Sequence, residues 1–121
     1  AVKELKVGTA YTINDILYGT NSSNLSSRSK FILKGFARFL KENPTITVSI
    51  QGHTDDVGDD GKNLKLSQDR ADGVKEFLVS QGIAKTRLKS EGIGETKPKV
   101  ANDSEENRAQ NRRTEFVITG M

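Results

Sequence analysis

The 121-residue sequence has no cysteine and a single histidine, His53. The lack of cysteine excludes disulfides, thiolate metal sites and cysteine nucleophiles. A catalytic zinc site usually has three protein ligands, commonly histidines, so carboxylates would have to complete such a site here. Metal-dependent hydrolysis is therefore disfavoured, and we expect the protein to use no metal or other cofactor.

Long apolar segments are also missing. No apolar run approaches the ~20 residues that a membrane-spanning helix needs. The first residues, Ala1 to Lys6, carry charges and lack the apolar stretch of a signal peptide. The chain as given is thus expected to be soluble, and a mature or excised fragment would look the same.

Aromatic residues, which stack on bases in many nucleic-acid-binding proteins, are scarce, with five Phe, two Tyr and no Trp. The net charge of +3 and the pI near 9.2 are by themselves compatible with nucleic-acid binding. However, the middle of the chain is acidic and no nucleic-acid-binding motif is present. We therefore expect no nucleic-acid partner.

The first half of the chain predicts strand, helix and strand within one domain. Residues 1–12 read as a lead-in and residues 15–18 as a short strand. A helix capped by Ser26 or Ser27 follows and stops at Asn43-Pro44. Residues 46–51 alternate apolar and polar side chains, which is typical of a strand with one face in the core.

The second half predicts a helix, two strands and a short helical segment. Asn63 is a plausible N-cap for the helix, and Gly82 stands where a C′ glycine is expected. Residues 87–90 and 114–119 are strand candidates, and residues 105–110 form a helical turn. This alternation predicts an α/β (α+β) two-layer sandwich, with a mixed four-stranded sheet and the helices on one face. Its order is strand, helix, strand, helix, strand, short helix, strand.

The first predicted helix carries a stripe of basic residues. Lys30, Lys34, Arg38 and Lys41 repeat at intervals of four, four and three residues. We interpret the stripe as a solvated outer face rather than a lipid-binding surface.

Candidate ligand-binding residues lie beyond the alternating strand. Asp55 follows its carboxyl end, a common location for ligand sites. Arg70 points roughly along the core-facing side of the following helix and therefore needs a carboxylate partner. The partner of Arg70 can be either Asp55, in an internal salt bridge, or the carboxylate of a ligand.

Three segments together carry a family resemblance. They are Gly52-His53-Thr54-Asp55-x-x-Gly58, then Asn63-x-x-Leu66-Ser67-x-x-Arg70-Ala71-x-x-Val74, and Arg108-Ala109-x-Asn111-Arg112-Arg113. In this order and spacing they resemble the OmpA-like peptidoglycan-binding family, over roughly residues 13–119. The resemblance implies a two-layer α/β domain that binds peptidoglycan noncovalently in the periplasm of a Gram-negative bacterium.

The resemblance also implies a ligand, the meso-diaminopimelate of the stem peptide. By resemblance, Asp55 binds the ammonium of this ligand and Arg70 binds its carboxylate. This division suits the two side chains, because a carboxylate only accepts hydrogen bonds and a guanidinium presents a planar fork of donors. Further site residues implied with them are Asn21, the backbone N–H of Val57, Asn63 and Arg112. Arg113 would point to the other side of its strand, and His53 reads as structural.

Parts of the sequence suggest three other functions. An EF-hand starting at Asp56 fails at its third position and at its final glutamate. A peptidoglycan hydrolase could use Asp55 and Asp56, but consecutive side chains at a strand end diverge. An envelope protein–protein scaffold remains the alternative to a non-catalytic tether that is fused to an outer-membrane-associated region.

Overall fold

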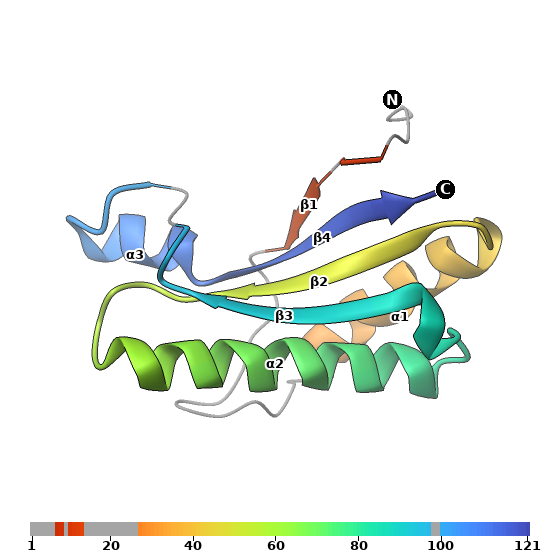
Figure 1. Cartoon of the computed structure of the whole chain (residues 1–121), viewed down its shortest axis with the longest axis horizontal. Helices are drawn as coiled ribbons and strands as arrows, with labels where there is room; N and C mark the ends of the chain where they lie inside the picture. Colours follow the sequence, from red (N-terminus) through yellow and green to blue (C-terminus); the bar gives the residue numbers. More distant parts are fainter. Residues whose placement is uncertain (1–6, 9, 14–26, 98–99) are drawn as a thin grey trace.

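The computed structural model describes residues 7–8, 10–13, 27–97 and 100–121. The chain forms, in order, the elements β1 (Ala10–Ile13), α1 (Ser27–Glu42), β2 (Thr47–His53), α2 (Asp60–Ser80), the 3-10 helix η1 (Lys85–Arg87), β3 (Leu88–Gly94), α3 (Glu105–Asn111) and β4 (Arg113–Gly120). Figure 1 shows the strands side by side, with α1 and α2 on one side of the sheet and α3 beyond one end. The predicted mixed α+β architecture, with helices packed on a sheet, is confirmed.

The strands form a mixed sheet in the order β1-β4-β2-β3. β2 and β3 run parallel, whereas β4 is antiparallel to both β2 and β1. The parallel pair places the carboxyl ends of β2 and β3 at the same edge of the sheet, which is where the sequence places Asp55.

The first strand differs from the prediction. The predicted strand at residues 15–18 lies outside the described residues. The observed β1 falls at Ala10–Ile13, largely within the segment expected to be a lead-in, and pairs with β4 from Ala10↔Val117 to Ile13↔Thr114. A four-residue edge strand is defined by this pairing with a distant partner, and its own sequence gives little signal.

The core lies between the helices and one face of the sheet. Leu33 of α1, Ile50 of β2, Val74 of α2 and Phe116 of β4 are all fully buried there. The ring of Phe36 lies 4.3 Å from the ring of Phe116, centroid to centroid. Since α1 and α2 share one apolar cluster with the sheet, the prediction that both helices pack on one face is confirmed.

The second helix begins earlier than predicted. Its N-cap is Asp59, whose carboxylate accepts the backbone N–H of Lys62 at 2.8 Å. Asn63 lies inside the first turns and donates its side-chain amide to the Val57 carbonyl at 2.9 Å, so its predicted capping role is wrong. Both residue types cap helices well, and sequence alone does not rank them. Gly82 follows the C-cap with a φ of 99°, as predicted.

Two glycines allow α2 to lie unusually close to the sheet. A Cβ atom on Gly92 would stand 2.5 Å from the backbone nitrogen of Gln68, and one on Gly52 would overlap the Ser67 carbonyl. The Gln68 side chain accepts the Gly92 N–H at 2.8 Å, and the Ser67 hydroxyl accepts that of Gly94 at 3.0 Å. This contact fixes α2, and with it Arg70, against the ends of β2 and β3.

Candidate ligand-binding site

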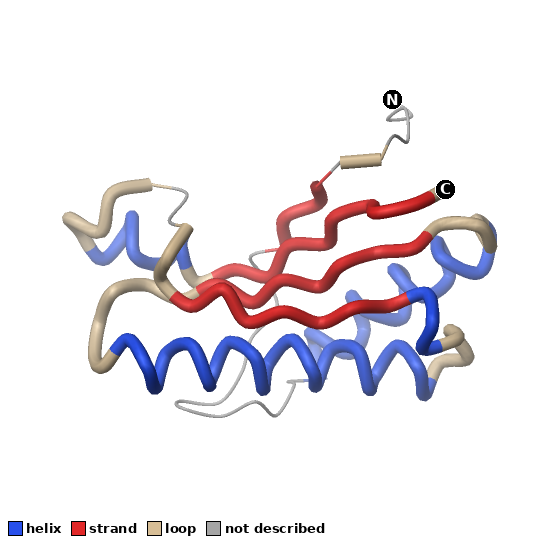
Figure 2. The backbone as a smooth tube through the Cα atoms, viewed as in Figure 1, coloured by secondary structure: helices blue, strands red, loops and turns tan. Residues whose placement is uncertain are grey.

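Several polar segments converge at one end of the sheet. Figure 2 shows the loop after β2, the loop after β3 and helix α3 gathered there. A small hollow at this end is lined by residues of β2, α2 and the start of β4, namely Gly52, His53, Ser67, Arg70, Arg112, Arg113 and Thr114. Three of its seven lining residues are arginines, so it is suited to an anionic group.

Asp55 is held in a defined orientation beside this hollow. It is 8% exposed. Its Oδ1 accepts the backbone N–H of Val57 at 3.0 Å, and its Oδ2 accepts Nη1 of Arg112 at 2.6 Å. A nearly buried carboxylate is stable as an anion only when paired and hydrogen-bonded, and these two contacts provide both.

Arg112 joins two carboxylates. Besides Asp55, it donates from Nη2 to Oε1 of Glu105 at 2.7 Å. The hydrogen bond to Asp55, followed by that to Glu105, raises the pKa of the Arg112 guanidinium above its ordinary value. The side chain is 41% exposed, so a ligand can reach it from solvent.

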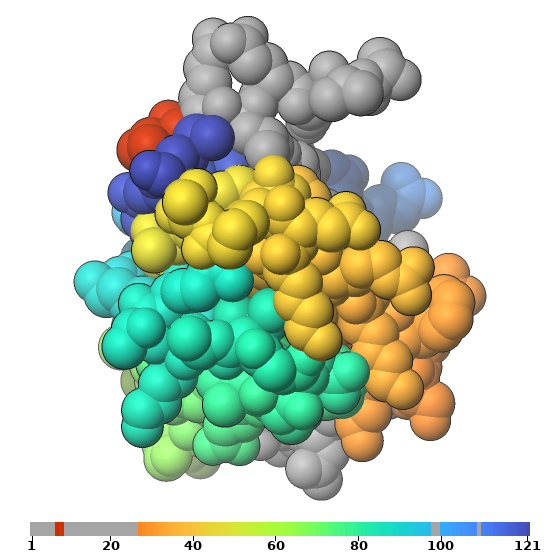
Figure 3. Space-filling view, turned by 90° about the vertical axis from the view of Figure 1, so that its right-hand side faces the viewer, coloured from red at the N-terminus to blue at the C-terminus, as the bar shows by residue number. Residues whose placement is uncertain are grey.

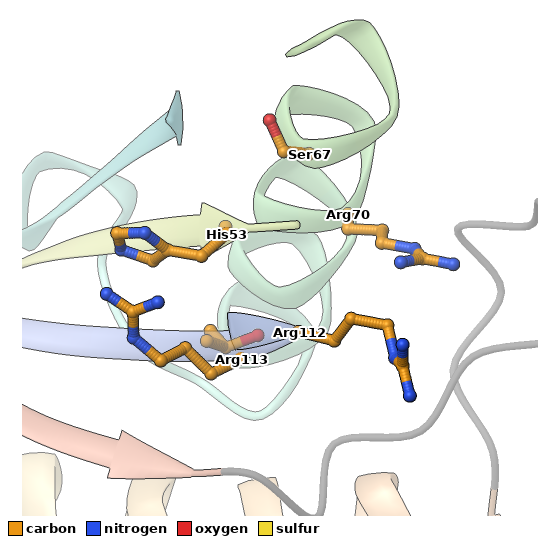
Figure 4. Close-up of a pocket in the computed structure, with 7 residues that line it drawn as sticks. His53, Ser67, Arg70, Arg112 and Arg113 are labelled. Carbon is orange, nitrogen blue, oxygen red and sulfur yellow. The ribbon is translucent and has the colours of Figure 1, made fainter. Parts of the chain in front are cut away.

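Arg70 reaches the same hollow from α2. Figure 4 shows the Arg70 and Arg112 side chains extending in the same direction from different elements. Both line the hollow, and Arg112 also contacts Asp55. The site therefore combines two guanidinium groups with one oriented carboxylate.

The side chains of Arg113 and His53 extend away from those of Arg70 and Arg112, as Figure 4 shows. Arg113 is 8% exposed and donates to Glu115 at 2.7 Å and to the Lys97 carbonyl at 3.0 Å, which ties β4 to the loop after β3. The predicted opposite orientation of Arg112 and Arg113 is therefore confirmed.

His53 is buried opposite Arg113 in the β2–β4 pair. Burial, followed by the charge of Arg113, lowers the pKa of His53 to about 4, although Glu115 acts in the opposite direction. Its Nε2 lies 3.7 Å from the Glu115 carboxylate. The histidine is thus neutral at pH 7, and its burial agrees with the structural role expected of it.

Not every residue implied by the resemblance can be assigned from this geometry. Asn21 lies outside the described residues. The Val57 N–H is directed at Asp55, and Asn63 fastens the same loop through the Val57 carbonyl. Both therefore support the position of Asp55 in this structure, and ligand contacts by either remain predictions.

Sequence reasoning missed three interactions around the site. Glu105 holds Arg112, and Asp56 pairs with Arg108 at 3.3 Å between the β2 loop and α3. Asn111 is fully buried, and its side-chain amide binds both the N–H and the carbonyl of Val100. The position of Asn111 next to Arg112 and Arg113 is the one sequence signal for any of these interactions. The pairs of Glu105 with Arg112 and of Asp56 with Arg108 have no such signal.

This arrangement can bind a ligand that carries both charges. Asp55 can accept hydrogen bonds from a cationic group while the two arginines donate to an anionic group nearby. Among the described residues, no three His, Asp or Glu side chains gather as metal ligands would. No described helix is long and apolar enough to cross a membrane.

Known proteins with similar sequences span longer chains. The probable lipoprotein YiaD of Escherichia coli is 36% identical over 108 residues, which cover 89% of this chain and 49% of YiaD. The peptidoglycan-binding protein ArfA of Mycobacterium tuberculosis is 37% identical over 109 residues, which cover 90% of this chain and 33% of ArfA. The chain thus spans about half or less of the length of these relatives.

A solved structure shares the fold. The cell wall anchor of the T6SS from Pseudomonas aeruginosa superimposes with a TM-score of 0.82 at 30% identity, covering all of this chain and 87% of the other. The sequence model of the OmpA family matches residues 17–112, which include Asp55, Arg70 and Arg112. The resemblance inferred from the sequence motifs is confirmed, and the chain belongs to the OmpA family.

Proposed function

We propose that this domain binds peptidoglycan noncovalently, without catalysis, and tethers an envelope protein to the cell wall. A relative that is 37% identical is a peptidoglycan-binding protein, and a structural neighbour is a cell wall anchor. The observation that carries the proposal is the juxtaposition of the nearly buried Asp55 with Arg112 at 2.6 Å, beside a hollow that Arg70 also lines.

The chemistry of the stem peptide suits this juxtaposition. The free end of meso-diaminopimelate carries an ammonium and a carboxylate on one carbon atom. A site for it needs an anion and a cation a few ångströms apart, both held in place before the ligand arrives. Hydrogen bonds orient Asp55 and Arg112 in this way, which reduces the entropy lost on binding.

Each charged residue has a separate role in the proposal. Asp55 accepts from the ligand ammonium, while Arg70 and Arg112 donate to the ligand carboxylate. The Val57 N–H and the Asn63 side chain keep the Asp55 loop in place. Asn21 is proposed as a further ligand contact.

The length of the relatives supports the proposed tether function. This chain corresponds to 49% of YiaD and 33% of ArfA, so those proteins carry additional segments. We propose that the domain works in the periplasm, fused to a region associated with the outer membrane. Several copies on one sacculus would hold firmly even if each binds weakly, because the effective concentration is high.

The test is co-sedimentation of the purified chain with isolated sacculi. Asp55→Asn removes the negative charge that would bind the ligand ammonium, and Asp56→Asn is the matched control, because Asp56 pairs with Arg108 instead. Loss of a charged hydrogen bond predicts sedimentation at least about tenfold weaker for Asp55→Asn only. Equal losses in the two variants, or none in either, would contradict the proposed site. Clearing of the sacculus suspension would contradict the absence of catalysis.

A further inference from the structure

The excess positive charge of the protein is concentrated on one helix. α1 contains five Lys/Arg residues and one Glu, a net charge of +4. The whole chain carries +3, so all residues outside α1 together carry −1. A charge of one sign on a single outer element is the electrostatic signature of a surface that attracts an anionic partner.

Four of these cations form one exposed stripe. Lys30, Lys34, Arg38 and Lys41 are exposed, whereas Leu33, Ala37 and Leu40 of the same helix are buried. At 100° per residue the four fall within an arc of about 80°, along about 16 Å of helix. Within the described part of the chain, none of the four has a carboxylate partner within 4 Å. Among the residues that the structure places, the charge of the stripe is therefore not neutralised by a neighbouring carboxylate.

An aromatic side chain stands beside this stripe. Phe31 is 78% exposed, the highest value among the large exposed hydrophobic residues described. It follows Lys30 and lies one turn before Lys34, so its ring projects among the cations. Exposure of a phenylalanine to water is unfavourable, so Phe31 offers an apolar contact beside a basic surface that can be attracted to an anionic membrane.

The stripe is separate from the ligand site. None of the residues that line the hollow belongs to α1. Figure 1 shows the C-terminal end of α1 at the opposite end of the sheet from α3, and Figure 3 shows α1 at the surface beside the end of α2. A partner of α1 would therefore leave the hollow open.

In place of the solvated face expected from the sequence, we propose that the α1 stripe, namely Lys30, Phe31, Lys34, Arg38 and Lys41, docks the domain on an anionic lipid bilayer. The convex face of an outer helix fits an extended flat partner better than a small molecule, which needs a concave site. Each lysine or arginine adds to the attraction by an anionic surface, and Phe31 inserts at the level of the headgroups. The domain would then contact the wall and a membrane surface through different faces.

Vesicle flotation tests the proposal. The purified chain is mixed at low salt with phosphatidylglycerol-rich vesicles or with neutral phosphatidylcholine vesicles. We expect binding to the anionic vesicles only, and weakening of at least about tenfold for Lys34→Glu plus Arg38→Glu. The matched control is Lys62→Glu plus Lys85→Glu, which changes the charge equally at exposed lysines outside α1. Circular dichroism verifies that each variant is folded.

Fluorescence provides a second readout, because the chain contains no tryptophan. Phe31→Trp should show a blue shift with anionic vesicles and none with neutral ones, whereas Leu64→Trp, on the exposed side of α2, should show none with either. The proposal is overturned if wild type ignores anionic vesicles, or if the two double variants bind them equally. Binding to polyglutamate without binding to vesicles would also overturn it, in favour of an acidic polypeptide partner.

Discussion

Asp55 and Arg112, 57 positions apart in the chain, form an ion pair of 2.6 Å between the loop after β2 and the residue that precedes β4. Without ligand, the anion and a cation of the proposed site thus satisfy each other. A zwitterionic ligand can enter this pair by replacing one ion pair with two, so the charges of the site are never left without partners. Such an exchange predicts modest affinity and strong dependence on ligand charge.

Glu105 forms an ion pair with Arg112, so in the proposed site it would compete with the ligand carboxylate for this arginine. We expect Glu105→Gln to raise affinity for a diaminopimelate stem peptide by about two- to fivefold, because an exposed ion pair contributes less than about 1 kcal/mol. Glu106→Gln removes the same charge from the same helix and has no ion pair within the described residues, so it serves as control.

Calorimetric titration measures this difference, and an amidated stem peptide sharpens it. Amidation removes the carboxylate that Arg112 would bind, so Glu105→Gln should leave affinity for the amidated peptide unchanged. Equal gains in Glu105→Gln and Glu106→Gln would instead indicate a general effect of charge. If no variant binds any stem peptide, the proposed function itself is wrong.

His53 makes the stability of the fold depend on pH. Its pKa is about 4 in the folded chain and about 6.5 in the unfolded chain. Between these values the unfolded state binds the additional proton, so stability falls as the pH is lowered from about 6.5 to 4. The contribution of His53 is at most roughly 3 kcal/mol, from 1.36 kcal/mol for each pKa unit.

Urea denaturation at pH 7, 5.5 and 4 checks this dependence. His53→Gln should lose less free energy of unfolding than wild type over this range, because glutamine does not titrate. The carboxylates contribute equally in both proteins, so only the difference in slope matters. Parallel curves would show that His53 is not a buried neutral histidine.

Glycine-to-alanine substitutions separate close packing from helix propensity. Gly92→Ala would place a Cβ atom 2.5 Å from the Gln68 nitrogen, so we expect a loss of about 1–3 kcal/mol in the free energy of unfolding. Gly35, on the exposed face of α1, has no atom within 4 Å of the added Cβ, so Gly35→Ala should stabilise by about 0.5–1 kcal/mol. Thermal denaturation measures both, and a neutral Gly92→Ala would contradict the close approach of α2.

Much of this fold is visible in the sequence, because periodicity reports burial directly. The alternation over residues 46–51 predicts β2, and the apolar spacing around Leu33 and Leu40 predicts α1. Both predictions fall within two residues of the observed ends. The sequence predicts the first strand at residues 15–18 rather than at β1, since an edge strand of four residues is selected by its pairing with β4. The start of α2 was misplaced because Asp59 and Asn63 are both good caps.

The candidate site was accessible mainly through the family motifs. Spacing placed Asp55 and Arg70 at one end of the sheet but left open whether they pair with each other. The structure gives Asp55 a different partner, Arg112, and gives that arginine a second one, Glu105. Contacts between residues so far apart depend on the packing of α3 against the β2 loop, which has no signature in a single sequence.

The most direct test of the zwitterion site is calorimetric titration with two stem tripeptides that differ in one group. One ends in meso-diaminopimelate and the other in lysine, which keeps the ammonium but lacks the second carboxylate. We predict saturable binding of the first, binding at least about tenfold weaker for the second, and loss of this preference in Arg70→Gln and Arg112→Gln. Equal affinity of wild type for the two peptides would contradict the proposed recognition by Asp55, Arg70 and Arg112.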